Sequence, residues 1–157
     1  MIQQGSKDKP KHYVLLVLRN GQLSFIIRGR RREELSLPVK LNDGHWHHVT
    51  INCIDRKATL SVVLGGNGHS QNQAQMKLPK KLNTMNMLFA GGLPQNTVTL
   101  PKDVISKTEV FKGCMRRFVV NTVTQDLAKK YNNVGQCFPR VEKGSYFPGD
   151  AFAEYSK

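Results

Sequence analysis

Apolar and polar residues alternate along much of this chain, and the segment from Leu41 to Cys53 shows the alternation most clearly. Val49, Ile51 and Cys53 fall on one face of an extended chain, and polar residues occupy the positions between them. A period of two predicts a strand that is half buried in an antiparallel sheet. Trp46, the single tryptophan, precedes this strand, and we expect it to anchor the core because tryptophan is usually well buried.

The same reasoning predicts further strands separated by tight turns. Tyr13–Leu18 is apolar on both faces and predicts a central strand that is covered on two sides. The Asn-Gly pair at 20–21 favours a hairpin turn into Gln22–Ile27, because both residues tolerate positive φ. A short strand over 33–39 is expected to stop at Pro38. The other predicted strands cover residues 58–64, 85–92 and 111–121.

Three segments lack this alternation. Gly65–Gln75 is polar and aperiodic, which predicts a loop, and Leu93–Glu109 is expected to form a long loop at the rim of the fold. Asp126–Tyr131 is the only segment with a helical pattern, and it is short. Regularly spaced strands with turn signals between them indicate an all-β protein, an antiparallel β-sandwich.

Length and composition narrow the class of protein. A chain of 157 residues with 39% hydrophobic content can bury one ordinary core. No run approaches the roughly 18 apolar residues of a membrane span, so we expect no membrane insertion. Residues 1–13 contain no apolar signal-peptide region, so a secreted protein would be represented here by a fragment. The net charge of +13 predicts a polyanionic partner, namely nucleic acid, anionic lipid or sulfated glycan.

The three cysteines do not have the spacing of a metal knuckle. Cys114 and Cys137 both lie in the last third of the chain, next to Gly113 and Gly135, and we expect them to form a disulfide. Such a bond predicts an oxidising compartment. Cys53 then remains unpaired on the apolar side of its strand, where a thiol behaves as a small hydrophobe.

The best candidates for function are clusters of basic residues. Guanidinium groups match sulfate oxygens with two donors each, and a corner loop presents several of them together. The alternative for each cluster is a solvated surface with no ligand. The candidate glycan-binding residues form an arginine corner, a lysine cluster and a third basic cluster: Arg28, Arg30, Arg31 and Arg32; Lys77, Lys80 and Lys81; and Lys112, Arg116 and Arg117.

No residues form a pattern that predicts catalysis or a bound metal. His45, His47 and His48 could face a zinc ion, but the sequence places no third and fourth ligand beside them, so hydrogen-bonded or solvated histidines are the better interpretation. Cys53 has apolar neighbours, which disfavour an activated thiol. Paired carboxylates, a nucleophile elbow and a phosphate loop are all missing from the sequence. We therefore expect a protein that is not an enzyme.

Several motifs in order resemble a laminin G-like domain. They are YVLLVLRNGQLSF, LNDGHWHHVTI, ATLSVVLGG, MLFAGGLP and FKGCMRRFVVN, followed by Cys137. The resemblance covers about Tyr13 to Cys137. It implies a jelly-roll, concanavalin-like sandwich in a secreted module of the extracellular matrix or basement membrane. Implied partners are heparan sulfate or other sulfated glycans, and receptors of the integrin or dystroglycan type.

The resemblance also bears on calcium. Several members of the family bind a calcium ion at the rim, with an Asp just before the strand that begins here at Tyr13. His12 occupies that position, and an imidazole is not one of the hard oxygen ligands that calcium requires. We therefore expect no cofactor, and dystroglycan-type binding, which depends on the ion in relatives, becomes less favoured.

Comparison with the family predicts three parts in the chain. Residues 1–11 are a polar leading segment or the stub of a strand, since the family has further strands at the N-terminal side. Residues 12–137 form the laminin G-like domain, with those N-terminal strands incomplete. Residues 138–157 resemble a linker and the opening strand of a following domain, as in the tandem domains at the C-terminal end of laminin α chains. Neighbouring domains of the same chain are then further partners.

Two alternatives to glycan binding remain open. The basic charge alone would equally suit a β-domain that binds nucleic acid, but aromatic residues are only 8% of the chain and fall mostly in core positions. Single-strand binders interleave aromatic and basic residues on an exposed sheet face, so we expect no nucleic-acid partner. The second alternative is a spacer domain within a tandem array that binds nothing itself.

Overall fold

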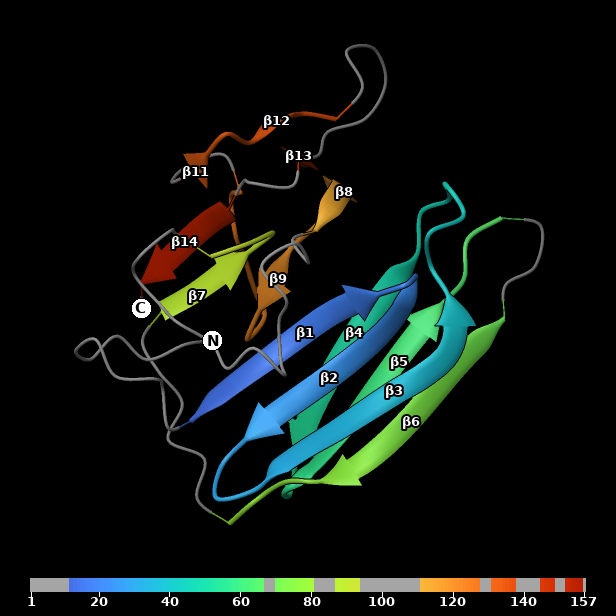
Figure 1. The fold of residues 1–157 in the computed structure, drawn as a ribbon, viewed down its shortest axis with the longest axis vertical. Coiled ribbons are helices and arrows are strands. Elements are labelled where there is room, and N and C mark those ends of the chain that lie inside the picture. Colours follow the sequence, from blue (N-terminus) through green and yellow to red (C-terminus); the bar gives the residue numbers. More distant parts are fainter. Residues whose placement is uncertain are drawn as a thin grey trace. The chain divides into compact units, whose positions relative to one another are not determined.

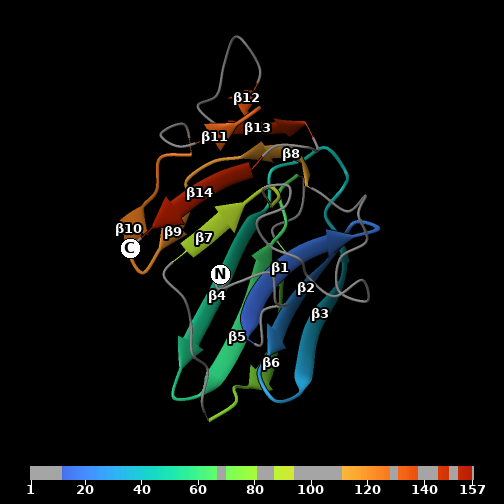
Figure 2. The same cartoon turned by 60° about the vertical axis from the view of Figure 1, so that its left-hand side comes forward.

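The computed structural model describes residues 12–66, 70–80, 87–93, 111–127, 131–137, 145–148 and 152–156. The chain divides into two compact units (Figures 1 and 2), the first of residues Lys11–Thr84 and the second of residues Met1–Pro10 and Met85–Lys157. Within the described ranges there are strands and turns but no helix, and every strand pair is antiparallel. The predicted all-β class is therefore confirmed, and no described segment is a helix long and apolar enough to cross a membrane.

The first unit is a sandwich of two three-stranded sheets (Figure 1). One sheet has the order β1-β2-β3, and the other has the order β4-β5-β6. Their facing sides share a core in which Leu23, Phe25, Ile27 and Leu37 pack against Ala58, Leu60 and Val62. The strands are β1 (Tyr13–Arg19), β2 (Gln22–Arg28), β3 (Arg32–Lys40), β4 (His48–Ile54), β5 (Lys57–Val63) and β6 (Gln71–Lys77).

Two hairpins of the first unit turn at pairs of residues with positive φ, and one of these turns is the predicted Asn-Gly pair. Asn20 and Gly21 have φ of 50° and 81° between β1 and β2, and Asp55 and Arg56 have φ of 47° and 61° between β4 and β5. Two consecutive positive φ values give the turn twist that matches the twist of the flanking strands. Both hairpins are therefore in register from one end to the other.

Two strand predictions for the first sheet are wrong. Among the described strands, β1 is an outer strand of its sheet, with Leu16 45% exposed, and β2 is the strand whose interior residues are all buried. β3 continues through Pro38 to Lys40. The β2–β3 register shifts between the pairs Ser24–Ser36 and Gln22–Lys40, so Pro38 lies at an irregularity of an outer described strand, where proline is tolerated.

Two predictions for the second sheet also fail. Residues 71–77 form β6, although the sequence predicts a loop over 65–75. Asn72, Ala74 and Met76 alternate with exposed residues, and only two of these three are apolar, which hides the period of two from the sequence.

Trp46 is half-buried beside the turn before β4 and is not a buried core residue. Its backbone carbonyl lies so close to Gly65 that a side chain there would collide with it.

The described residues of the second unit form short strands in two three-stranded sheets and one hairpin. The sheet orders are β11-β14-β7 and β12-β13-β8, and β9 pairs with β10. Its strands are β7 (Met87–Ala90), β8 (Lys112–Met115), β9 (Val119–Val120), β10 (Val123–Thr124), β11 (Tyr131–Asn132), β12 (Gly135–Gln136), β13 (Ser145–Pro148) and β14 (Phe152–Ser156).

A separate core holds the second unit together. Phe147, Ala90 and Leu127 are buried, and the rings of Phe111 and Phe147 meet edge to face with centroids 6.0 Å apart. The predicted single strand over 111–121 is divided, because Arg117 has a φ of 51° and ends the regular extension between β8 and β9. Further apolar residues packed against this core are Met115, Phe118 and Val134.

The predicted disulfide between Cys114 and Cys137 is confirmed, with a Cα–Cα distance of 5.8 Å. Cys53 is a free cysteine, as predicted, but its residue is exposed at the end of β4. In the segment predicted as a helix, Leu127 lies in a turn and Tyr131 begins β11, while 128–130 lie outside the described residues.

The predicted division into three parts stays a prediction. Residues 1–11 lie outside the described residues, and so does most of the predicted rim loop over 93–109. For the tail, the structure adds one fact. β13 pairs with β8, and β14 pairs with β7, so residues 145–156 join strands from the middle of the chain.

Candidate functional site

The predicted arginine corner is the connection between β2 and β3. The N–H of Gly29 donates to the carbonyl of Arg31 at 3.1 Å, which closes the corner tightly. Arg28, Arg30 and Arg31 are all exposed there. Such a tight turn leaves no room for long side chains inside it, so the guanidinium groups are presented to solvent.

Arg32 differs from the other three arginines because it has an acidic partner. Its guanidinium Nη2 donates to Glu34 Oε2 at 2.7 Å, and Arg19 Nη1 lies 3.7 Å from Glu34 Oε1. Glu34 therefore offsets part of the positive charge on β3. We place Arg32 at the border of the candidate site.

The predicted lysine cluster lies beside the arginine corner. Pro79 approaches Gly29, since a side chain added at Gly29 would be 3.6 Å from Pro79 Cγ. Lys77 and Lys80 flank this contact and are exposed. Two clusters far apart in the sequence thus share one end of the first unit, where β2 and β6 both end (Figure 1). Lys81, predicted with them, lies outside the described residues.

Sequence reasoning missed two basic residues that belong to the same end. The N–H of Leu78 donates to the carbonyl of Arg56 at 2.6 Å, which fixes the β4–β5 turn against the end of β6. Lys57 lies directly opposite Lys77 in the β5–β6 register. Only the pairing of β6 with β5 shows that Lys57 and Lys77 are neighbours. We call the resulting surface the basic end, and it consists of Arg28, Arg30, Arg31, Arg56, Lys57, Lys77 and Lys80, all exposed.

Like charges face each other at this end. Arg28 is the cross-strand partner of Arg32, and Lys57 is the partner of Lys77. Like charges that are directly opposite destabilise a sheet. An open depression next to the lysine pair is lined by Asp55, Arg56, Lys57, Gln75, Met76 and Lys77, and Asp55 is the one acid among these lining residues. A bound anion would relieve the repulsion between Lys57 and Lys77.

The third predicted cluster belongs to the second unit. Lys112 is in β8, and Arg116 and Arg117 follow it, all three exposed. Consecutive residues of a regular strand point to opposite faces, but the positive φ of Arg117 interrupts that regularity after Arg116. This cluster has three cations, compared with seven at the basic end.

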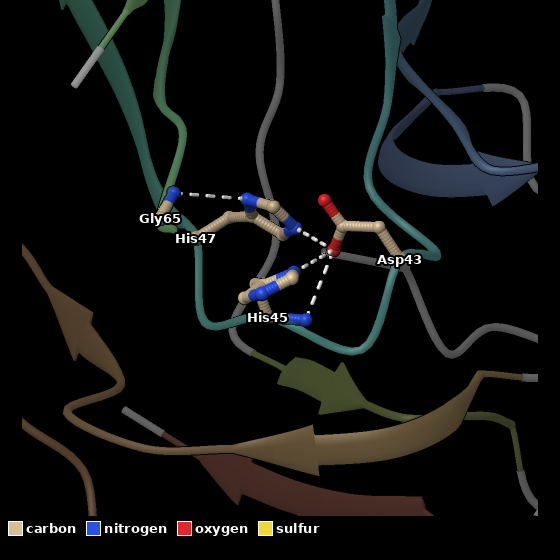
Figure 3. Close-up of polar contacts among 4 residues, drawn as sticks. All are labelled: Asp43, His45, His47 and Gly65. Carbon is tan, nitrogen blue, oxygen red and sulfur yellow. Dashed lines mark hydrogen bonds and ion pairs between the residues drawn. The ribbon is translucent and has the colours of Figure 1, made fainter. Parts of the chain in front are cut away.

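In the connection between β3 and β4, His45 and His47 form a hydrogen-bonded group around Asp43 (Figure 3). Asp43 Oδ1 accepts from the backbone N–H of His45 at 2.9 Å and lies 2.8 Å from His47 Nε2. His47 Nδ1 accepts from the N–H of Gly65 at 3.3 Å, and its side chain is only 6% exposed. The hydrogen-bonded interpretation of these histidines is confirmed, whereas His48 is exposed on β4. Across the described ranges, no three His, Cys, Asp or Glu side chains are grouped to hold a metal ion.

These contacts predict a dependence of stability on pH. The backbone N–H of His45 is the largest cause that lowers the pKa of Asp43 below its usual 3.8, and His47 adds to it. The charged form therefore stabilises the fold above about pH 3.8, and this contribution is lost as the pH falls through the lower pKa of the folded protein. We expect Asp43→Ala to unfold at lower urea than wild type at pH 7, with the difference shrinking below pH 3.8.

Asp43→Asn is the matched control for that experiment, since it removes the charge and keeps an acceptor oxygen. It should lose part of the stability at pH 7 and show less change with pH than wild type. A constant difference between wild type and Asp43→Ala from pH 7 to pH 2.5 would contradict the role of the carboxylate.

Neither Cys53 nor His12 shows signs of chemistry. Burial of part of the Cys53 side chain raises the pKa of its thiol, which is the opposite of activation. His12 is half-buried, and its Nδ1 is buried with no hydrogen-bond partner within the described structure. A nitrogen donor at this place does not suit calcium, which prefers oxygen ligands. The absence of bound calcium stays a prediction.

Comparison with known proteins identifies the relatives of this chain. The family model of the laminin G domain matches residues 1–126. Laminin subunit alpha-1 of Mus musculus is 27% identical over 92% of this chain, and growth arrest-specific protein 6 of Mus musculus is 28% identical over 91%. Laminin subunit alpha of Drosophila melanogaster is 26% identical over 94%. The chain spans 5% of the length of the first of these relatives and 21% of the second. No solved structure matches it significantly.

Proposed function

Because this chain belongs to the laminin G domain family, we propose that it is an adhesion module of the extracellular matrix that binds sulfated glycans through its basic end. Laminin alpha chains are among its relatives, and the Cys114–Cys137 disulfide suits an oxidising, extracellular compartment. The proposed role is binding by charge, without covalent chemistry. Receptors of the integrin or dystroglycan type stay further proposals, drawn from the family alone.

The observation that carries this proposal is the grouping of seven exposed cations at the basic end, which includes one directly opposed pair. Lys57 opposes Lys77 in one sheet, and Arg28 ends β2 in the other sheet at the same place. A cluster of like charges costs local stability, and departures of this kind from a mixed surface are expected at functional sites.

Sulfated glycans suit this surface better than a single small anion does. The arginine corner offers bidentate donors to sulfate, and the lysines add mobile point charges around it. A linear polymer with repeated sulfates can contact the corner, the β4–β5 turn and the lysines at once. Binding of this kind releases counterions and weakens steeply with salt, as for other polyanions.

The test is retention on immobilised heparin. We expect the variant with Arg28, Arg30 and Arg31 all replaced by alanine to elute at a lower NaCl concentration than wild type, because three of the seven cations of the basic end are lost. Thermal unfolding of the variant checks that the fold is kept.

The matched control changes the same number of charges in the other unit. Lys112, Arg116 and Arg117 replaced by alanine should leave the elution concentration close to that of wild type. If this control falls as far as the corner variant, net charge alone drives retention and the assignment to the basic end is wrong. Stronger binding of single-stranded DNA than of heparin with equal charge would favour the nucleic-acid alternative instead.

A further inference from the structure

The end of the family match and the end of the second unit do not coincide. The laminin G domain match stops at residue 126, and both β7 and β8 lie before that point. In the described part of the chain, however, the only strand paired with β7 is β14, and the only strand paired with β8 is β13. Both β13 and β14 come from residues 145–156, beyond the match. Strands inside the matched region thus depend on a segment outside it.

Phe147 shows how closely this segment fits. Its side chain is 0% exposed and is the largest fully buried one among the described residues. It contacts the ring of Phe111 and packs in the core with Ala90. Gly91 has a φ of 86°, and a Cβ there would overlap the Phe147 ring. The end of β7 therefore has no side chain where the tail places an aromatic ring.

The segment also has a central place in both sheets. β14 lies between β11 and β7, and β13 lies between β12 and β8. β13 pairs with β8 over four residues, from Ser145 opposite Met115 to Pro148 opposite Lys112. This pairing includes Cys114, which forms the disulfide. A β-strand edge left open is a ready template for another chain. Residues 145–156 cover one such edge on β7 and one on β8.

We propose that the edges of β7 and β8 form an acceptor site for an extended segment with an aromatic anchor, and that residues 145–156 of the same chain fill it by strand donation. Backbone hydrogen bonds supply the pairing, and the pocket beside Gly91 selects the aromatic residue, as in other cases of strand addition. In this account the tail completes the domain that precedes it. This is an alternative to the prediction that residues 138–157 open a following domain.

The register of β7 and β14 provides the test in the full chain. Met87 is opposite Ser156. In a Cys53→Ser background, we expect the double variant Met87→Cys with Ser156→Cys to form a disulfide within one chain under mild oxidation, located by peptide mass mapping. Cross-strand partners lie within disulfide reach.

Met87→Cys with Glu154→Cys is the matched control, because it shifts the pair by two residues on the same strand. Diagonal positions lie about 7–8 Å apart, beyond easy reach of a disulfide. We expect the in-register pair to form its bond at least tenfold faster than this control. Equal rates for the two variants would overturn the proposal. A bond that forms only between two chains would also overturn it, because the donor would then be a second copy.

Discussion

Replacing Phe147 with alanine is expected to lower the free energy of unfolding of the second unit by about 3–5 kcal/mol, as for other buried phenylalanines. The side chain is fully buried between Phe111 and the end of β7, and alanine would leave a cavity that Gly91 cannot fill. Because Phe147 comes from the segment that pairs with β8, the loss would also loosen that edge. Urea unfolding monitored by far-UV circular dichroism measures the change.

Phe147→Leu separates size from shape in that experiment. It keeps most of the buried apolar volume and should cost clearly less than the alanine variant. Leu16→Ala is the exposed counterpart, since Leu16 is 45% exposed on an outer strand and should change stability little. A loss of under 1 kcal/mol for Phe147→Ala would contradict the packing described here.

Removing the disulfide is the second large change. The bond between Cys114 and Cys137 closes a loop over a sequence separation of 23. In the chain-entropy account, a loop of this size stabilises the fold by about 3 kcal/mol by restricting the unfolded chain. We expect the double variant Cys114→Ala with Cys137→Ala to unfold at correspondingly lower urea, and reduction of the wild type to have a similar effect.

Cys53→Ser is the control for cysteine chemistry, because Cys53 is free and exposed. It should unfold at nearly the same urea concentration as the wild type. If the double alanine variant were as stable as the wild type, the disulfide would not contribute to the stability of the second unit.

The parts of the fold that could be predicted are those set by local chemistry. Asn20-Gly21 and the turn at Asp55 specify their hairpins through backbone conformation alone. β6 could not be found, because its inward positions include Asn72 and its burial comes from the neighbouring sheet. Pro38 was expected to end a strand, but only the sheet order shows that β3 is an outer strand where proline is tolerated.

In the candidate site, too, only the features set by local sequence could be predicted. The arginine corner is visible as a run of charges in the sequence, so it could be predicted without a structure. Arg56 and Lys57 join it only through the register of β5 with β6, and that strand pair was not predicted. The separation of Lys112 and its neighbours into the other unit likewise depends on long-range pairing. Charge can be counted from sequence, but its grouping depends on which strands meet.

The most direct test of the central claim is the salt dependence of affinity for a defined heparin oligosaccharide. A plot of log Kd against log NaCl concentration should be linear and steep for the wild type. If the basic end binds by charge, the variant with Arg28, Arg30 and Arg31 replaced by alanine should show a slope smaller in magnitude by about two to three, by analogy with counterion release from nucleic acids. An unchanged slope in this variant, or a wild-type affinity that does not vary with salt, would contradict the account.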